Sequence, residues 1–327
     1  EVHPDPGASP GGPRGLGLDA IAGSEPELCP GRVPASPKPD PRGSGRVEPL
    51  AQDRYKVQFT ADDEFRAELE RRFDTRITDE GINQRELDIY QAFKQCIDHA
   101  LKEKPDLILH AGDLFDSVRP TNRSITFAMQ QLLRLHQANI PLIIISGNHE
   151  TPRLKETGHI FQIFDHLTNL TLIYNNTYEK HHFTINNQTL TIHAIPQCPT
   201  KEAFNHQLTQ ITPDKNSDYN IFLAHGAVAD IKEFRMNEFN ELMIPLTKIT
   251  PQFDYIALGH YHKYTQLTPN TYYAGSPERL SFTEAPDPKG YIKITLKKNI
   301  TTTFQTIHTR PMHDPPPIDC TNQTIET

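Results

Sequence analysis

The stretch His110-Ala111-Gly112-Asp113-Leu114-Phe115-Asp116 decides the fold, because an apolar run ends there in two carboxylates. The preceding run, Asp106-Leu107-Ile108-Leu109, is short, has branched aliphatic side chains and directly follows Lys104-Pro105. Such a run is typical of a strand buried on both faces of an α/β sheet. Asp113 would then lie at the carboxyl end of that strand, where open α/β sheets bind their ligands. Taken alone, Asp113 is better explained as a helix N-cap.

The same pattern follows three further apolar runs, at residues 141–145, 219–224 and 255–258. Each run ends in glycine and in side chains that bind metals. The segments are Gly147-Asn148-His149-Glu150, His225-Gly226 and Gly259-His260-Tyr261-His262. Oxygen and imidazole donors suit manganese, iron or zinc rather than calcium or a thiolate-bound ion. One such residue would indicate a capped turn or a hydrogen-bonded histidine, but their recurrence at four strand ends predicts a metal site.

His260 and His262 are two residues apart, so both can point into one site only if the backbone there is irregular. We expect Gly259 to supply that freedom.

Length and composition indicate one α/β domain with additional segments, since the chain has 327 residues and a hydrophobic content of 36%. Pro and Gly make up 20 of the first 50 residues, which predicts a disordered segment over 1–53. The domain is expected over 54–309, followed by a flexible Pro-rich tail over 310–327. No signal peptide or membrane-spanning run is recognisable.

The cysteines and the charge narrow the class of protein further. Four scattered cysteines without paired spacing favour a reducing cytoplasm over a disulfide framework or a zinc knuckle. The net charge of -8 does not indicate a basic nucleic-acid surface. Metal-dependent nucleases can nevertheless be acidic, because the bound cations supply the local positive charge.

Helical and strand patterns alternate in the first part of the chain, and strands dominate later. This order predicts an α/β fold of two mixed β-sheets packed face to face and flanked by helices, a four-layer αββα sandwich. Helices are expected at 84–103, 123–138, 159–167 and 201–210. Strands are expected at 54–60, 106–111, 141–145, 170–174, 182–186, 189–195, 219–224, 255–258, 272–274, 290–296 and 302–308.

These motifs, in this order and spacing, resemble those of the calcineurin-like binuclear metallophosphoesterases. Within that family, residues 110–120, 145–149 and 275–284 resemble the DNA-repair exonuclease branch, which includes the bacterial SbcD nuclease subunit. The resemblance covers roughly residues 73–296, so it implies the fold as well as the site.

The resemblance also implies a role for each motif residue. Two divalent ions, most suitably Mn²⁺, would share Asp113 as a ligand. Asn148, His225 and His260 would complete the coordination of one ion, and His262 would bind the other. Two such cations activate a water and stabilise charge on both apical oxygens during in-line displacement. His149 would polarise the scissile phosphate or protonate the leaving oxygen, with Asp116 a polar residue close by.

One motif departs from the family pattern, in which the first strand ends in Asp-x-His. The strand-like segment here ends in Asp62-Asp63-Glu64. Asp62 could replace the family Asp as a metal ligand, with Glu64 in the place of the His. Asp62 could equally cap a helix over 63–72, and residues 1–72 could be a foreign graft, since 54–72 resembles a stretch found beside HNH-type endonuclease domains.

The leading hypothesis is a metal-dependent DNA exonuclease or endonuclease of double-strand-break repair or recombination. The alternatives are a general phosphodiesterase of small substrates and a catalytically impaired scaffold. The family implies DNA and an SbcC-type coiled-coil ATPase as partners. The sequence ends before the expected ATPase-binding segment, so weak or absent binding is expected. A homodimer through residues 84–103 or 123–138 is open, because core packing explains those apolar faces equally well.

Overall fold

The computed structural model describes residues 77–79, 81–229, 241–245, 247, 252–297 and 299–312, together with the strands at 46–51 and 54–58. The chain divides into two compact units, residues 61–322 and residues 1–60 with 323–327. The predicted domain of residues 54–309 stays a prediction.

The smaller unit contains an antiparallel pair of strands, β1 (Arg46–Ala51) and β2 (Arg54–Gln58). The strand predicted from residue 54 is present as β2. The prediction that 1–53 is disordered stays a prediction; β1 lies within that range and pairs with β2. The rest of 1–53 lies outside the described residues.

The first sheet of the larger unit is small and wholly parallel, with the order β3 (Ile108–His110), β4 (Leu142–Ile145) and β5 (Leu170–Ile173). Two helices pack against this sheet, α2 (Gln84–Glu103) and α3 (Asn122–Gln137). Helix α2 precedes β3, and α3 connects β3 to β4. Their bounds agree with the predicted helices to within one residue.

Both helices begin at a capping side chain. Asn83 accepts a hydrogen bond from the backbone N–H of Arg85, and Thr121 accepts one from Ser124. These bonds satisfy N–H groups that have no partner inside the helix.

The second sheet is mixed and has six strands in the order β12-β13-β11-β8-β7-β6. The bounds are β6 (Glu179–Ile185), β7 (Gln188–Ile195), β8 (Tyr219–His225), β11 (Tyr255–Gly259), β12 (Thr265–Thr268) and β13 (Thr271–Tyr273). The turn between β6 and β7 is Asn186-Asn187, with both residues at positive φ, as expected for a two-residue hairpin. Helix α4 (Lys201–Gln210) was predicted with the same bounds.

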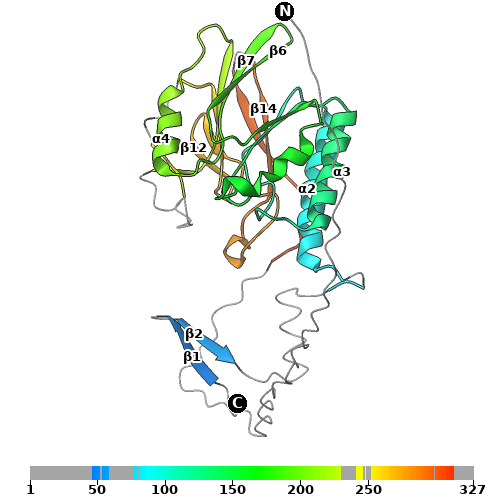
Figure 1. The fold of residues 1–327 in the computed structure, drawn as a ribbon. Helices are drawn as coiled ribbons and strands as arrows, with labels where there is room; N and C mark the ends of the chain where they lie inside the picture. The colour runs from blue at the N-terminus through cyan, green and yellow to red at the C-terminus, as the bar shows by residue number, and fades with distance from the viewer. Residues whose placement is uncertain are drawn as a thin grey trace, which may run out of the picture. The chain divides into compact units, whose positions relative to one another are not determined.

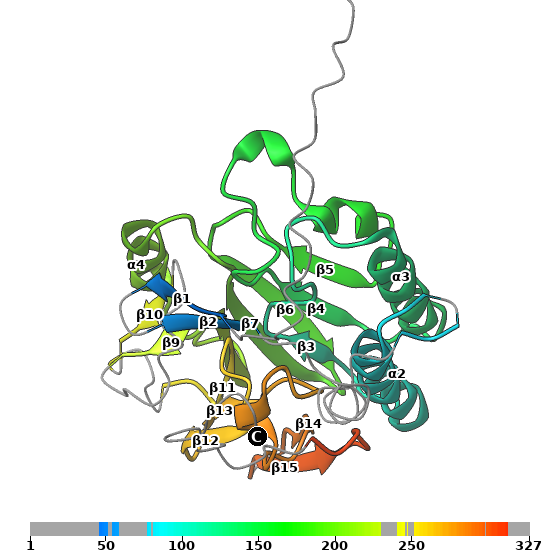
Figure 2. The same cartoon turned by 90° about the horizontal axis from the view of Figure 1, so that it is seen from below.

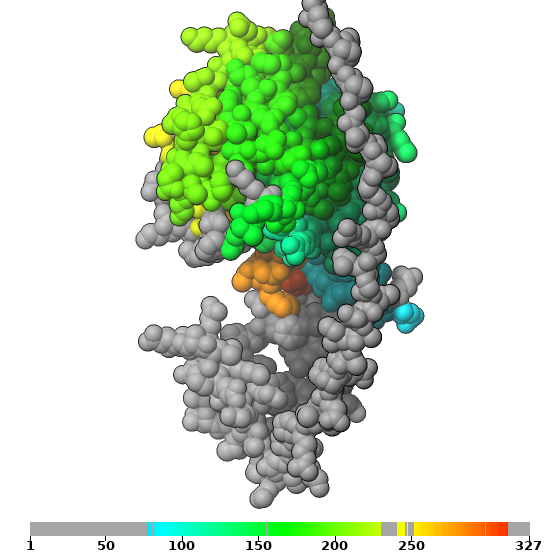
Figure 3. All heavy atoms as spheres, viewed as in Figure 1, coloured from blue at the N-terminus to red at the C-terminus, as the bar shows by residue number. Residues whose placement is uncertain are grey.

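Side chains on alternate sides of each strand fill three hydrophobic layers. In β4, Leu142 and Ile144 face the α2/α3 cluster, whereas Ile143 and Ile145 join the cluster shared with the larger sheet. Helix α4 packs on the opposite face of that sheet through Phe204 and Leu208. The resulting order of helices, sheet, sheet and helix confirms the predicted αββα sandwich (Figures 1 and 2). Figure 3 shows α4, in light green, at the outer surface.

Shorter elements connect these layers. They include β9 (Ala227–Val228) with β10 (Met243–Ile244), the antiparallel pair β14 (Gly290–Thr295) and β15 (Thr301–Thr306), and the 3₁₀ turns Lys155–Thr157, Ile160–Phe164 and Phe282–Glu284.

The helix predicted around 159–167 is wrong in type and length, because only the 3₁₀ turn Ile160–Phe164 forms. Its buried side chains, Phe161 and Phe164, are three residues apart, the spacing that a 3₁₀ turn stacks on one side.

Within the described part of the chain, no helix is long and apolar enough to cross a membrane.

Candidate functional site

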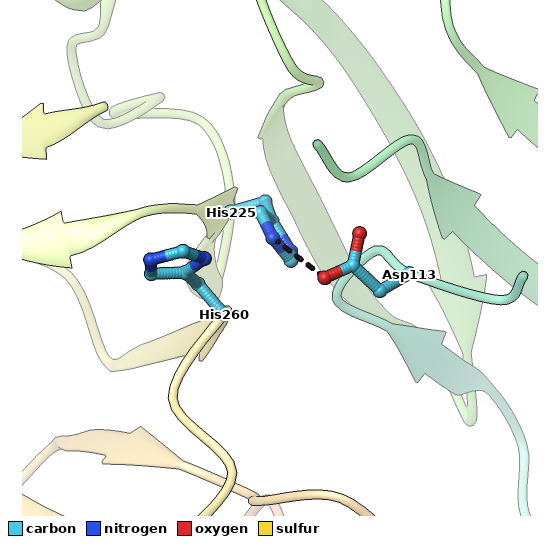
Figure 4. A group of neighbouring side chains, drawn as sticks. All are labelled: Asp113, His225 and His260. Carbon is cyan, nitrogen blue, oxygen red and sulfur yellow. Dashed lines mark ion pairs between the residues drawn. The ribbon is translucent and has the colours of Figure 1, made fainter. Parts of the chain in front are cut away.

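Four of the predicted site residues lie at the carboxyl ends of strands from both sheets and form one cluster. Asp113 follows β3, Asn148 follows β4, His225 ends β8 and His260 follows β11. These residues are called the convergent group below. Figure 4 shows Asp113 and His225 facing each other, with the His260 ring on the other side of His225.

The polar atoms of the convergent group lie within hydrogen-bond distance of each other. His225 Nε2 is 3.1 Å from Asp113 Oδ2 and 2.9 Å from Asn148 Oδ1. His260 Nδ1 is 3.2 Å from the same Asn148 oxygen. One potential ligand atom from each of Asp113, His225 and His260 lies within 4.8 Å of the other two. The side chains therefore offer one cation several donors at once.

Two glycines permit this close approach. A Cβ atom on Gly147 would lie 2.1 Å from Asp113 Oδ1, and one on Gly259 would lie 1.8 Å from the carbonyl oxygen of Ala111. The expectation that Gly259 supplies the irregular backbone is wrong, because His260 itself adopts a φ of 97°. Gly259 is needed for space, and the conformational strain falls on His260.

The surroundings of His225 fit a bound cation. Its Nδ1 is 2.7 Å from the carbonyl oxygen of Ala111 and its Nε2 faces Asp113 and Asn148, so both ring nitrogens meet oxygen acceptors. A neutral imidazole carries one N–H, which Ala111 takes at Nδ1. The lone pair of Nε2 would then be free to bind a divalent cation together with the Asp113 carboxylate.

The same pair of groups, Asp113 and His225, dominates the electrostatics of the convergent group. Burial opposes charge on both side chains, but their mutual attraction prevails. It raises the pKa of His225 above the ordinary value and holds the pKa of Asp113 below its usual range. Asp113 is therefore present as the carboxylate that a metal ion requires.

Glu150 joins the turns that carry Asp113 and Asn148. Its Oε1 accepts hydrogen bonds from the backbone N–H groups of Asp113, at 3.1 Å, and Gly147, at 3.0 Å. Burial, and then the neighbouring Asp113 carboxylate, raise the pKa of Glu150. Sequence reasoning assigned Glu150 no role, although its place directly after Asn148-His149 was a signal for one.

The two residues predicted to act in catalysis, His149 and Asp116, contact each other beside the convergent group. His149 Nδ1 is 3.1 Å from Asp116 Oδ1, and the backbone N–H of His149 donates to Asp113 Oδ1 at 3.1 Å. The His149 side chain is partly exposed and that of Asp116 almost fully so. His149 is thus anchored to the convergent group by its backbone while its ring remains accessible.

His262 is held by a carboxylate that sequence reasoning did not assign. Its Nδ1 is 3.2 Å from Glu284 Oε1. His260 has a similar partner, with its Nε2 3.2 Å from Glu241 Oε1. Glu284 falls within the motif 275–284, which was a signal for it, whereas no pattern marks Glu241. Asp62 and Glu64 lie outside the described residues.

Comparison with known proteins gives one family. Residues 82–264, more than half of the chain, match the family described as calcineurin-like phosphoesterase.

The curated relatives include proteins named DNA double-strand break repair protein Mre11. The protein from Methanococcus maripaludis is 32% identical over 217 residues, covering 64% of this chain and 56% of the relative. The one from Saccharolobus solfataricus is 34% identical over 204 residues, covering 61% and 50%. The one from Methanocaldococcus jannaschii is 30% identical over 189 residues, covering 56% and 47%. The chain thus spans about half the length of these relatives.

Proposed function

Because this chain belongs to the calcineurin-like phosphoesterase family, we propose that it is a metal-dependent phosphodiester hydrolase that cleaves DNA in double-strand break repair. The observation that carries this proposal is the convergent group, which brings four ligand-type side chains from both sheets to one point. The similarity to Mre11-named proteins supports DNA as the substrate.

The convergent group would hold one divalent ion through a carboxylate oxygen, an amide oxygen and two imidazole nitrogens. A divalent ion there supplies Lewis acidity and positive charge toward a phosphodiester. Manganese suits this mixture of oxygen and nitrogen donors. Burial of His225 and His260 keeps their donor atoms away from bulk water.

His149 would serve the reaction through its imidazole. The Asp116 carboxylate accepts a hydrogen bond from His149 Nδ1 and so orients the imidazole ring. The opposite nitrogen, Nε2, can then donate to a phosphoryl oxygen or deliver a proton to the leaving oxygen. The partial exposure of His149 suits a group that must meet an incoming polymer.

A second ion would use the other side of Asp113 together with His262. We propose Asp62 as a further ligand of that ion, since a carboxylate can take the place of the family's first-motif Asp. Asp62→Ala should then lower the manganese stoichiometry from about two ions per chain to about one, measured by calorimetry. An unchanged stoichiometry would remove Asp62 from the site.

We further propose an SbcC-type coiled-coil ATPase as the protein partner, on the similarity to Mre11-named relatives. A homodimer is part of the same proposal. Pull-down of a purified ATPase of this type with the full chain would test the ATPase partner. Sedimentation analysis of the full chain would test the homodimer.

The proposed reaction is tested with the full chain, MnCl₂ and two substrates, linear duplex DNA and bis(p-nitrophenyl) phosphate. Cleavage of both substrates, abolished by EDTA, is expected. Hydrolysis of the small ester alone would identify a small-substrate phosphodiesterase instead. Bound manganese without either activity would identify a catalytically impaired protein.

A further inference from the structure

The segment between β13 and β14 places a buried ion pair directly against His262. Glu284 Oε1 is 3.2 Å from His262 Nδ1, and Glu284 Oε2 is 2.5 Å from Lys289 Nζ. Glu284 is 7% exposed and Lys289 2%. Lys289 also donates to the backbone carbonyl of His262 at 2.9 Å. These three residues are called the His262 arm below.

The backbone around Glu284 is fixed by a second cation. The Arg279 guanidinium donates to the carbonyl oxygens of Glu284 at 3.2 Å, Ala285 at 3.1 Å and Asp287 at 3.0 Å. The Ser281 hydroxyl donates to Glu284 Oε1 at 3.1 Å. Both ends of the Glu284 side chain are therefore held, which restricts its carboxylate to one position.

This arrangement determines which nitrogen of His262 carries the proton. The Glu284 carboxylate accepts a hydrogen bond from His262 Nδ1, so the neutral imidazole has its N–H at Nδ1 and its lone pair on Nε2. A histidine that donates one N–H to a carboxylate is oriented to bind a metal through the other nitrogen. Lys289 balances the charge of Glu284, so that the carboxylate stays ionised in a buried place.

We propose that Glu284, fixed by Lys289, is the positioning residue that sets the tautomer and ring orientation of His262 for metal binding. This proposal rests on the proposed function for the role of His262 as a ligand. The geometry of His260 gives an internal contrast, because Glu241 faces its Nε2 and Asn148 its Nδ1. His260 and His262 should therefore carry their protons on opposite nitrogens.

The first test is ¹⁵N NMR of the imidazole nitrogens in the metal-free full chain at about pH 8, where an ordinary imidazole is neutral. The chain has 16 histidines, so a His262→Gln variant assigns the signal. We expect His262 to be protonated at Nδ1. Protonation at Nε2 in the wild-type protein would overturn the proposal without any variant.

Two double variants separate the hydrogen bond from the packing. Glu284→Leu with Lys289→Met removes the whole ion pair, a replacement that folded proteins often tolerate. Glu284→Gln with Lys289→Met keeps an acceptor oxygen opposite Nδ1. The first should lose the single tautomer and bind Mn²⁺ about 10–100-fold more weakly by calorimetry, and the second should largely retain both.

The matched control is Glu179→Gln, because Glu179 Oε2 lies 3.0 Å from His181 Nε2 on edge strand β6. This variant should leave the His262 tautomer and the Mn²⁺ affinity unchanged. Equal losses in both double variants, or none in either, would overturn the positioning role. A protein that shows the expected tautomer and affinity changes but cuts no DNA would support that role and refute the proposed nuclease.

Discussion

The convergent group and the His262 arm hold their histidines in different ways. In the convergent group, strands of two sheets end at the same place, and the backbone itself brings the side chains together. In the His262 arm, one loop folds back, and a buried carboxylate and lysine fix the ring. Sheet geometry thus positions one set of ligands, whereas a charge network positions the other.

This difference predicts that the two regions fail differently when changed. Loss of a ligand from the convergent group should remove metal without unfolding the sheets. Loss of a charge from the His262 arm should cost folding stability as well, because it leaves the opposite charge buried.

The largest effect is expected for Asp113→Ala. Its carboxylate contacts His225 and accepts the backbone N–H of His149, and it is the proposed bridge between ions. We expect no manganese binding by calorimetry and a loss of cleavage of at least about 10²-fold. The exposed Asp106→Asn, at the start of the same segment, should change neither. Full manganese binding by Asp113→Ala would contradict the assignment of the convergent group.

His149→Ala should separate catalysis from metal binding. Only the ring is removed, and the backbone bond from residue 149 to Asp113 remains. Cleavage should fall by about 10²–10⁴-fold with manganese stoichiometry unchanged. Asp116→Asn should have a smaller effect in the same direction, since it only orients the ring. Loss of metal from His149→Ala would place this side chain among the ligands.

The sequence predicted all four residues of the convergent group, because strand ends can be recognised in it. Apolar runs ending in glycine and polar residues placed Asp113, Asn148, His225 and His260, and the parallel strand pairs β3–β4 and β8–β11 end where these side chains meet. Helix periodicity likewise located α2 and α3, because an amphipathic face repeats at a fixed spacing.

The sequence did not predict the partners of these ligands. Glu241 and Glu284 lie about 20 residues from the histidines they contact, and such pairs depend on how loops fold back rather than on a local pattern. The same holds for the positive φ of His260, which no local pattern in the sequence marks. Residues 159–167 look helical in sequence, but their two buried phenylalanines suit a single 3₁₀ turn.

Lys289→Met should destabilise the His262 arm. The variant leaves the Glu284 carboxylate buried without its cation, which should lower the free energy of unfolding by about 3 kcal/mol. Lys94→Met removes a similar ion pair, 2.7 Å from Asp98, but on the exposed face of α2, where about 0.5 kcal/mol is expected. Urea unfolding followed by circular dichroism measures both. Equal losses of unfolding free energy in Lys289→Met and Lys94→Met would show that the buried ion pair stabilises the fold no more than the exposed one.

Gly147→Ala should destabilise the fold less than Lys289→Met does, and it tests whether the close spacing of the strand ends sustains the convergent group. The new Cβ would lie 2.1 Å from Asp113 Oδ1 and 2.5 Å from the Asp113 backbone nitrogen, so the carboxylate and the backbone that carries it must move, at a cost of about 2 kcal/mol. Gly81→Ala is the matched control, because its φ is +74° but, among the described residues other than its chain neighbours, no heavy atom lies within 4 Å of the new Cβ. Backbone strain there should cost about 1 kcal/mol.

The two glycine variants differ most clearly in metal binding. Displacement of Asp113 should weaken manganese binding in Gly147→Ala, whereas Gly81→Ala should bind manganese as the wild type does. If Gly147→Ala kept full affinity, the Asp113 carboxylate could shift without leaving the ion. The close approach of the strand ends would then be a packing feature rather than the device that places the ligands.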